Sequence, residues 1–217
     1  MTLRIDIWSD VNCPWCYIGK RRFEEGLRSF VHADEVEVTW HAYLLDPSLP
    51  ERFDGTEAEY LAQMKGMSPE QVEGMLAQVT EAAASVGLDY HFEKLVPAQS
   101  LRAHALVKAA ALHGKDAGAV KEALLSAHFV EGRVTSDEDV LVEIGASVGL
   151  SEEVVRSSLT DRQVLGLVQE DITTAQRIGV TGVPFFVFDQ KYAVSGAQQV
   201  EVFTQVLERA WTEAHGE

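Results

Sequence analysis

Cysteine is scarce in this sequence: Cys13 and Cys16 are the only two among 217 residues. A bridge between positions so close together closes a very small loop and removes little entropy from the unfolded chain, so a stabilising disulfide framework is excluded. The chain also lacks a second cysteine pair, and its seven histidines show no tight paired spacing. Structural zinc needs four such ligands, so we expect no metal site.

Long apolar runs and basic clusters are also lacking. The hydrophobic content of 46% is dispersed, so no membrane span is expected. The net charge is −16, and the longest basic run is Lys20-Arg21-Arg22, which makes nucleic acid an unsuitable partner. Residues 1–8 contain no basic segment followed by an apolar core, so we expect no secretory signal and a cytoplasmic location.

The two cysteines stand where a strand meets a helix. Apolar and polar residues alternate over residues 3–8, which predicts a strand, and the polar residues 9–12 predict a turn. Pro14 suits the first turn of a helix, and Asn12 is the expected N-cap. This places Cys13 beside the free N–H groups of a helix N-terminus.

The Cys-Pro-Trp-Cys spacing predicts a reversible dithiol–disulfide pair. Partial positive charge at the helix N-terminus favours a thiolate, so we expect a lowered pKa and an accessible sulfur at Cys13. Cys16 lies one turn further into the helix and is the expected shielded, resolving thiol. Trp15 stands between them, where an aromatic side chain can contact a substrate chain.

A second pattern occurs far downstream, at residues 178–198. Phe185 to Phe188 and Tyr192 to Val194 predict two strands of a hairpin, and Pro184 precedes the first. Taken alone, Pro184 is an ordinary strand-initiating proline. Together with the cysteine pair, the Val183-Pro184 step resembles the cis-proline loop that faces the dithiol in thioredoxin-like enzymes. Such a loop leaves the backbone of Val183 able to pair with an extended substrate.

These features together resemble the DsbA-like thioredoxin-family oxidoreductases, and within them the FrnE branch. The resemblance is carried by Ser9-Asp10-Val11-Asn12-Cys13-Pro14-Trp15-Cys16-Tyr17-Ile18-Gly19-Lys20, Gly132-Arg133, Leu141, Gly149-Leu150, Gly179-Val180-Thr181-Gly182-Val183-Pro184-Phe185-Phe186 and Ser195-Gly196-Ala197-Gln198. Glutathione-dependent isomerases and kappa-class glutathione transferases of the same superfamily usually carry serine in place of Cys13.

The pattern along the chain predicts an α/β thioredoxin fold interrupted by a helical insertion, as in DsbA-like proteins. Prolines and a glycine at 47–55 break the strand pattern, and helical periodicity then continues to about residue 168. We therefore expect a thioredoxin-like domain formed by residues 1–45 and 165–217, and a helical insertion domain formed by residues 46–164.

Three functions fit this sequence. The first is a protein dithiol–disulfide oxidoreductase or isomerase that works through a mixed disulfide and acts on protein or peptide thiols. The second is a glutathione-dependent isomerase or transferase of the same superfamily, and the third is a redox-sensing binding module without catalysis. No cofactor is expected beyond the Cys13–Cys16 pair itself, with glutathione as a candidate co-substrate. The sequence is compatible with a homodimer.

Overall fold

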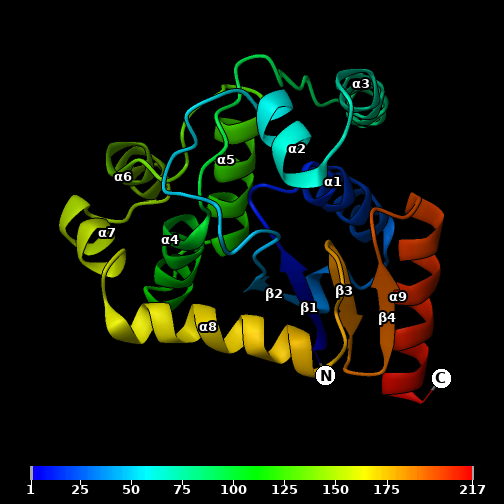
Figure 1. Cartoon of the computed structure of the whole chain (residues 1–217). Helices are drawn as coiled ribbons and strands as arrows, with labels where there is room; N and C mark the ends of the chain where they lie inside the picture. The colour runs from blue at the N-terminus through cyan, green and yellow to red at the C-terminus, as the bar shows by residue number, and fades with distance from the viewer. Residues whose placement is uncertain (1, 217) are drawn as a thin grey trace.

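The centre of the computed structural model, which describes residues 2–216, is a four-stranded sheet in the order β2–β1–β3–β4 (Figure 1). β1 pairs in parallel with β2 and antiparallel with β3, and β4 completes the antiparallel hairpin. The strands are β1 (Leu3–Ser9), β2 (Val36–Ala42), β3 (Phe185–Phe188) and β4 (Tyr192–Ser195). The protein is therefore mixed α/β, as predicted.

One face of the sheet packs on two helices, α1 (Pro14–Ser29) and α9 (Val200–His215), which also contact each other. Leu3, Ile5 and Ile7 alternate along β1 and are buried in a core cluster with Phe23 of α1 and Phe203 of α9. A short 3-10 helix, η1 (Ala33–Glu35), leads from α1 to β2. This packing fixes the start of α1 beside the end of β1.

Between β2 and β3 the described chain forms helices only. They are α2 (Glu57–Lys65), α3 (Pro69–Ala84), α4 (Leu101–Leu112), α5 (Ala117–Phe129), α6 (Glu138–Ser147), α7 (Glu152–Ser158) and α8 (Arg162–Arg177). In Figure 1, α2 and α3 lie above the sheet and α4 to α7 to its left. No helix within residues 2–216 is long and apolar enough to span a membrane. The two-domain division remains a prediction; because α8 begins at Arg162, the predicted boundary at 164/165 falls inside its first turn.

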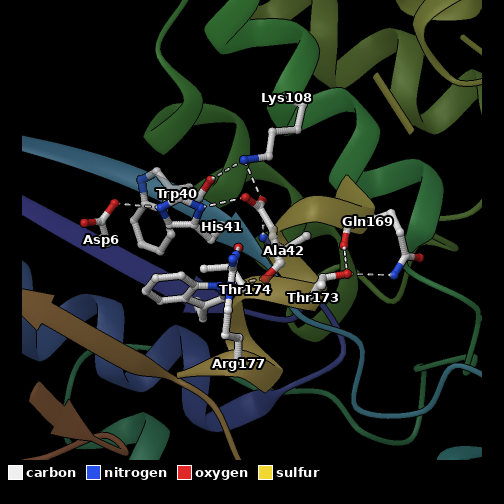
Figure 2. A network of polar contacts seen from close by, with 11 residues as sticks. Asp6, Trp40, His41, Ala42, Lys108, Gln169, Thr173, Thr174 and Arg177 are labelled. Carbon is white, nitrogen blue, oxygen red and sulfur yellow. Dashed lines mark hydrogen bonds and ion pairs between the residues drawn. The ribbon is translucent and has the colours of Figure 1, made fainter. Parts of the chain in front are cut away.

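A polar network ties α8 to the sheet (Figure 2). Asp171 of α8 accepts a hydrogen bond from His41 of β2 at 2.7 Å and forms an ion pair with Lys108 of α4 at 2.5 Å. The other ring nitrogen of His41 lies 2.7 Å from Asp6 of β1. The Ala42 N–H donates to the Asp171 carboxylate at 2.8 Å. The Trp8 indole N–H donates to the backbone carbonyl of Asp171 at 3.1 Å. The network holds the helix that leads into the loop at Val183.

Candidate active site

The cysteine pair lies at the junction of β1 and α1, as predicted. Cys13 is the N-cap residue of α1, and Pro14 is its first helical residue. The predicted N-cap, Asn12, is wrong by one position. The Asn12 amide donates to the Ala98 carbonyl at 2.8 Å, so its side chain joins the strand–helix turn to the segment before α4 instead of capping α1. The backbone N–H of Cys16 donates to the Cys13 carbonyl at 3.0 Å and closes the first turn.

Both cysteines are free thiols, and both are buried. Cys13 is 4% exposed and Cys16 is 1% exposed, so little surface of either residue is exposed; that Cys13 is the more accessible of the two thiols stays a prediction. The Cys13 thiol donates to the carbonyl of Val183 at 3.3 Å, so the downstream loop contributes to this burial. Trp15 is exposed, as expected for a side chain at the mouth of the site.

The pKa of the Cys13 thiol also differs from the expectation. It is raised well above its ordinary value, first by the hydrogen bond with the Cys16 side chain and second by burial. The predicted lowering of this pKa is therefore wrong for the protein with both thiols present. The N-terminus of α1 alone would lower this pKa, whereas the neighbouring thiol and the surrounding apolar atoms raise it.

The loop before β3 reaches the cysteines because α1 presents a glycine to it. The Val183–Pro184 peptide bond is cis. A Cβ atom at Gly19 of α1 would lie 2.7 Å from Cγ of Pro184, so only glycine permits this close approach. The Pro184 carbonyl accepts from the N–H of Gly196 at 2.8 Å, which fixes the loop from the side of β4. The structure thus brings together the five residues singled out in the sequence.

A cavity of about 340 Å³ opens beside Cys13. Its lining on the sheet side includes Cys13, Pro14, Trp15 and Val183, whereas Cys16 takes no part. On the side of the helical segment the lining is mainly apolar, with Leu61, Met75, Leu76, Val79 and Phe92. The cavity therefore lies where the predicted domains meet, and a molecule held in it would adjoin only the first sulfur.

Asp10, three residues before Cys13, is buried in a cluster of hydrogen-bonded polar groups. It accepts hydrogen bonds from Ser100 Oγ at 2.5 Å, from the Leu45 N–H at 2.8 Å and from His104 at 3.3 Å. Burial alone would raise the pKa of Asp10, but its partners, His104 first, lower it. Asp10 therefore fits a structural hydrogen-bond acceptor better than a proton acceptor for the dithiol, because an ionised and fully bonded carboxylate takes up a proton poorly.

Lys121 is the residue of this region that the sequence argument missed. It lies on α5, is 1% exposed, and donates to the carbonyl of Ser9 at 3.2 Å. Its spacing from Val120, Leu124 and Leu125 puts it on the buried face of α5, and that pattern was available in the sequence.

Burial lowers the pKa of Lys121 to about 8, while Cys16, Asp10 and Cys13 act to raise it. The charge of the protonated Lys121 therefore acts electrostatically on both thiols.

No metal-binding cluster of three or more His, Cys, Asp or Glu side chains is found in the described part of the chain. The site holds two thiols, with a buried lysine nearby and a cavity at one sulfur.

Comparison with known proteins identifies the family. The model of the DSBA-like thioredoxin domain matches residues 4–208. A probable DsbA oxidoreductase from Streptomyces coelicolor has a crystal structure that is 39% identical, with a TM-score of 0.90, covering 97% of this chain and 91% of that one. The chain therefore belongs to the DsbA-like thioredoxin family, and with it to the thiol–disulfide oxidoreductases.

Two more distant proteins match along almost their whole length. The uncharacterized protein YwbO of Bacillus subtilis is 23% identical over 214 residues, covering 95% of this chain and 96% of YwbO. The cytosolic disulfide reductase DsbM of Pseudomonas aeruginosa, solved with GSH, is 19% identical with a TM-score of 0.68, covering 96% and 98% of the two chains. At that identity, DsbM supports the shared fold alone. The predicted DsbA-like fold with its helical insertion is confirmed.

Proposed function

We propose that this DsbA-like oxidoreductase exchanges disulfides with protein or peptide substrates through a mixed disulfide on Cys13, as an oxidoreductase or isomerase. The observation that carries the proposal is the position of Cys13 between the cavity and the Val183 carbonyl, with Cys16 one turn behind it. An attacking sulfur needs access to a substrate disulfide, and a resolving sulfur needs access only to its neighbour.

The reaction proceeds in two balanced steps. The Cys13 thiolate attacks one sulfur of a substrate disulfide, forming a mixed disulfide and releasing one substrate thiolate. The Cys16 thiolate then attacks Cys13, which forms the Cys13–Cys16 disulfide and releases the second substrate thiolate. Two electrons pass from the dithiol to the substrate, and the two thiol protons end on the released thiols. Run in reverse, the same steps oxidise a substrate dithiol.

The remaining candidate residues act on binding. The exposed Trp15 offers an aromatic surface next to Cys13, and the Val183 backbone offers hydrogen-bonding groups to an extended peptide. Pro184 keeps the loop against α1 through its contact with Gly19.

Replacing Cys16 with serine tests the order of the two sulfurs. We expect Cys16→Ser to accumulate a mixed disulfide with a peptide disulfide, visible as an added mass that thiol reductant removes. Cys13→Ser is the matched control and should form no such adduct. An adduct carried by Cys16 alone would overturn the assignment. Full turnover in Cys16→Ser would instead favour glutathione chemistry, and altered partner binding without turnover would favour a redox-sensing module.

Glutathione remains the second candidate, as a co-substrate or in an isomerase or transferase reaction. It is supported by DsbM, a protein of similar fold that was solved with GSH. Titration of the Cys13–Cys16 couple against reduced and oxidised glutathione tests whether the pair exchanges with it. DsbM is described as cytosolic, and we propose a cytoplasmic location for this chain too, which cell fractionation would test.

Membership of the FrnE branch and a homodimeric state are further proposals. The first is supported by the Cys-Pro-Trp-Cys segment and the Gly-Val-Pro segment at residues 182–184. The second would be tested by sedimentation equilibrium.

A further inference from the structure

Glu57 carries an unpaired carboxyl group in the cavity beside Cys13. It is the first residue of α2 and contributes to the cavity lining. No hydrogen bond or ion pair to its side chain is found among the side chains that the structure describes. Burial raises the pKa of Glu57 to about 7. Glu57 is half-buried at the cavity, near Tyr60, and its ionised form has no cationic partner there, so a cation that binds in the cavity would stabilise the carboxylate.

The other polar groups of the cavity do not supply such a cation. The Asp46 carboxylate is engaged, since it accepts from the Tyr60 hydroxyl at 2.7 Å and from the Ser48 N–H at 2.8 Å. His128 is buried, which lowers its pKa to about 4, so it is neutral at physiological pH. No lysine or arginine belongs to the lining in the described part of the chain. The cavity is thus mainly apolar, with two carboxyl groups, of which Glu57 is about half ionised at pH 7 and becomes more fully charged as the pH rises or a cation binds.

We propose that this cavity receives a lysine or arginine side chain that neighbours the reactive cysteine of the substrate. The proposal rests on the function proposed above and names its substrate class. The apolar stem of the basic side chain lies along Leu61 and Leu76, and its charged end reaches the carboxylate of Glu57. Long basic side chains combine these two properties, since their methylene stems bury well while the end group seeks a polar partner.

Charge complementarity selects this occupant over glutathione. A volume of about 340 Å³ is at the small end of ligand cavities and suits one side chain next to the reacting sulfur. Glutathione carries two carboxylates for one ammonium, so binding it here would bring like charges towards Glu57 and Asp46. The net charge of −16 adds a general repulsion of anions. Acidic peptides are disfavoured for the same reasons.

Rates of exchange with three peptides test the proposal. Each peptide is a homodimeric disulfide with one cysteine, flanked on both sides by lysine, norleucine or glutamate. The rate constant with the reduced enzyme is divided by that with dithiothreitol, which removes the intrinsic reactivity of each disulfide. We expect the parent protein to prefer the lysine peptide over the norleucine peptide by about tenfold, as one charge-assisted contact provides. The glutamate peptide and oxidised glutathione should react most slowly.

Two variants that each lose one carboxyl group distinguish binding in the cavity from long-range electrostatic attraction of the peptide. Glu57→Gln should bring the ratio of lysine to norleucine rates to within about twofold of one, since the charged contact is lost. Glu81→Gln removes an exposed carboxyl of α3 outside the cavity and should keep the parent ratio. In 0.5 M salt the parent preference should largely persist, because screening acts mainly on distant exposed charges.

Each outcome has a definite meaning. Exchange at Cys13 with equal rates for the lysine and norleucine peptides, or a parent ratio kept in Glu57→Gln, overturns the cavity assignment and leaves the proposed function standing. Absence of any mixed disulfide on Cys13 with all three peptides overturns the proposed function, and the inference with it.

Discussion

Lys121 is a buried cation whose hydrogen bond goes to a backbone carbonyl, that of Ser9. In the described part of the chain it forms no ion pair, although the more distant Asp10 acts on it electrostatically. The interactions that raise its pKa come from Cys16, Asp10 and Cys13, and such interactions are mutual. The ammonium group therefore stabilises a thiolate at the pair and opposes the effects that raise the pKa of Cys13.

Substituting Lys121 with methionine removes this charge and keeps a long apolar stem. We expect Lys121→Met to raise the apparent thiol pKa by about one unit and to shift the pH profile of exchange to higher pH. Thiolate absorbance at 240 nm and exchange rates from pH 6 to pH 10 measure both. Folding should be preserved, since a buried unpaired charge is costly to keep.

The control for this substitution is Lys115→Met, which removes an exposed lysine near the start of α5. It should leave the pH profile where the parent has it. A profile that moves equally in both variants, or in neither, would contradict the role of Lys121.

At the scale of single residues, the sequence predicted which residues form the site but not how deeply they are buried or which groups they contact. Cys13, Trp15, Cys16, Val183 and Pro184 follow from local spacing, and the fold brings all five together. The burial and raised pKa of Cys13 were not predictable, because they depend on contacts formed only in the folded chain. The unpaired state of Glu57 was hidden for the same reason.

Among the elements, α1 and the loop before β3 depend on one close contact. In Gly19→Ala the new Cβ would lie 2.7 Å from Pro184 and 3.4 Å from Ala197, so helix and loop must move apart. We expect a loss of about 1–3 kcal/mol in unfolding free energy, as for an overpacked core. Exchange should also slow severalfold, because the loop no longer holds its position beside Cys13. Denaturant unfolding and exchange rates measure the two effects.

Gly166→Ala on α8 is the matched comparison, because a Cβ atom there meets nothing within 4 Å. In an open helical position alanine is more stabilising than glycine by up to about 1 kcal/mol. This variant should therefore unfold at a higher denaturant concentration than the parent and exchange disulfides at the parent rate. Equal behaviour of the two variants would exclude the packing argument.

The elements were more predictable than the way they pack. Alternation at residues 3–8 and the aromatic run at 185–188 gave strands that the structure contains as β1 and β3. The hairpin follows from the turn at 189–191, where Asp189 and Gln190 adopt positive φ angles. The attachment of α8 to the sheet was not foreseen, because His41 and Asp171 are far apart in the sequence and no local pattern links them.

The stability of the whole molecule should depend on pH through that network. Burial opposes a charge on His41, but its bonds to Asp171 and Asp6 outweigh burial and raise its pKa. A raised folded-state pKa adds stability that is fully present below the unfolded value of about 6.5 and is lost as pH rises through the folded value. His41→Gln should therefore destabilise the protein more at pH 5.5 than at pH 8.5, as measured by urea unfolding.

The comparison for this variant is His113→Gln, at an exposed position after α4. The buried His104 and His128 are present in both variants, so the difference between the variants reports on His41. The pKa values of these two histidines are lowered, so the stability that they contribute is lost as the pH falls. A destabilisation by His41→Gln that stays constant between the two pH values would show that His41 acts only through packing.

The contact between the Cys13 thiol and the Val183 carbonyl makes the substrate-facing backbone sensitive to oxidation state. A thiol can donate a hydrogen bond, whereas a sulfur in a disulfide carries no hydrogen and cannot. Once Cys13 is oxidised, the Val183 carbonyl loses this donor and its lone pairs are available to the N–H of an extended peptide. Reduction returns the donor, and the thiol then competes with the bound chain for the same oxygen. The availability of one backbone oxygen thus depends on whether the dithiol is oxidised or reduced. The oxidised protein should therefore bind an extended peptide more tightly than the reduced protein does.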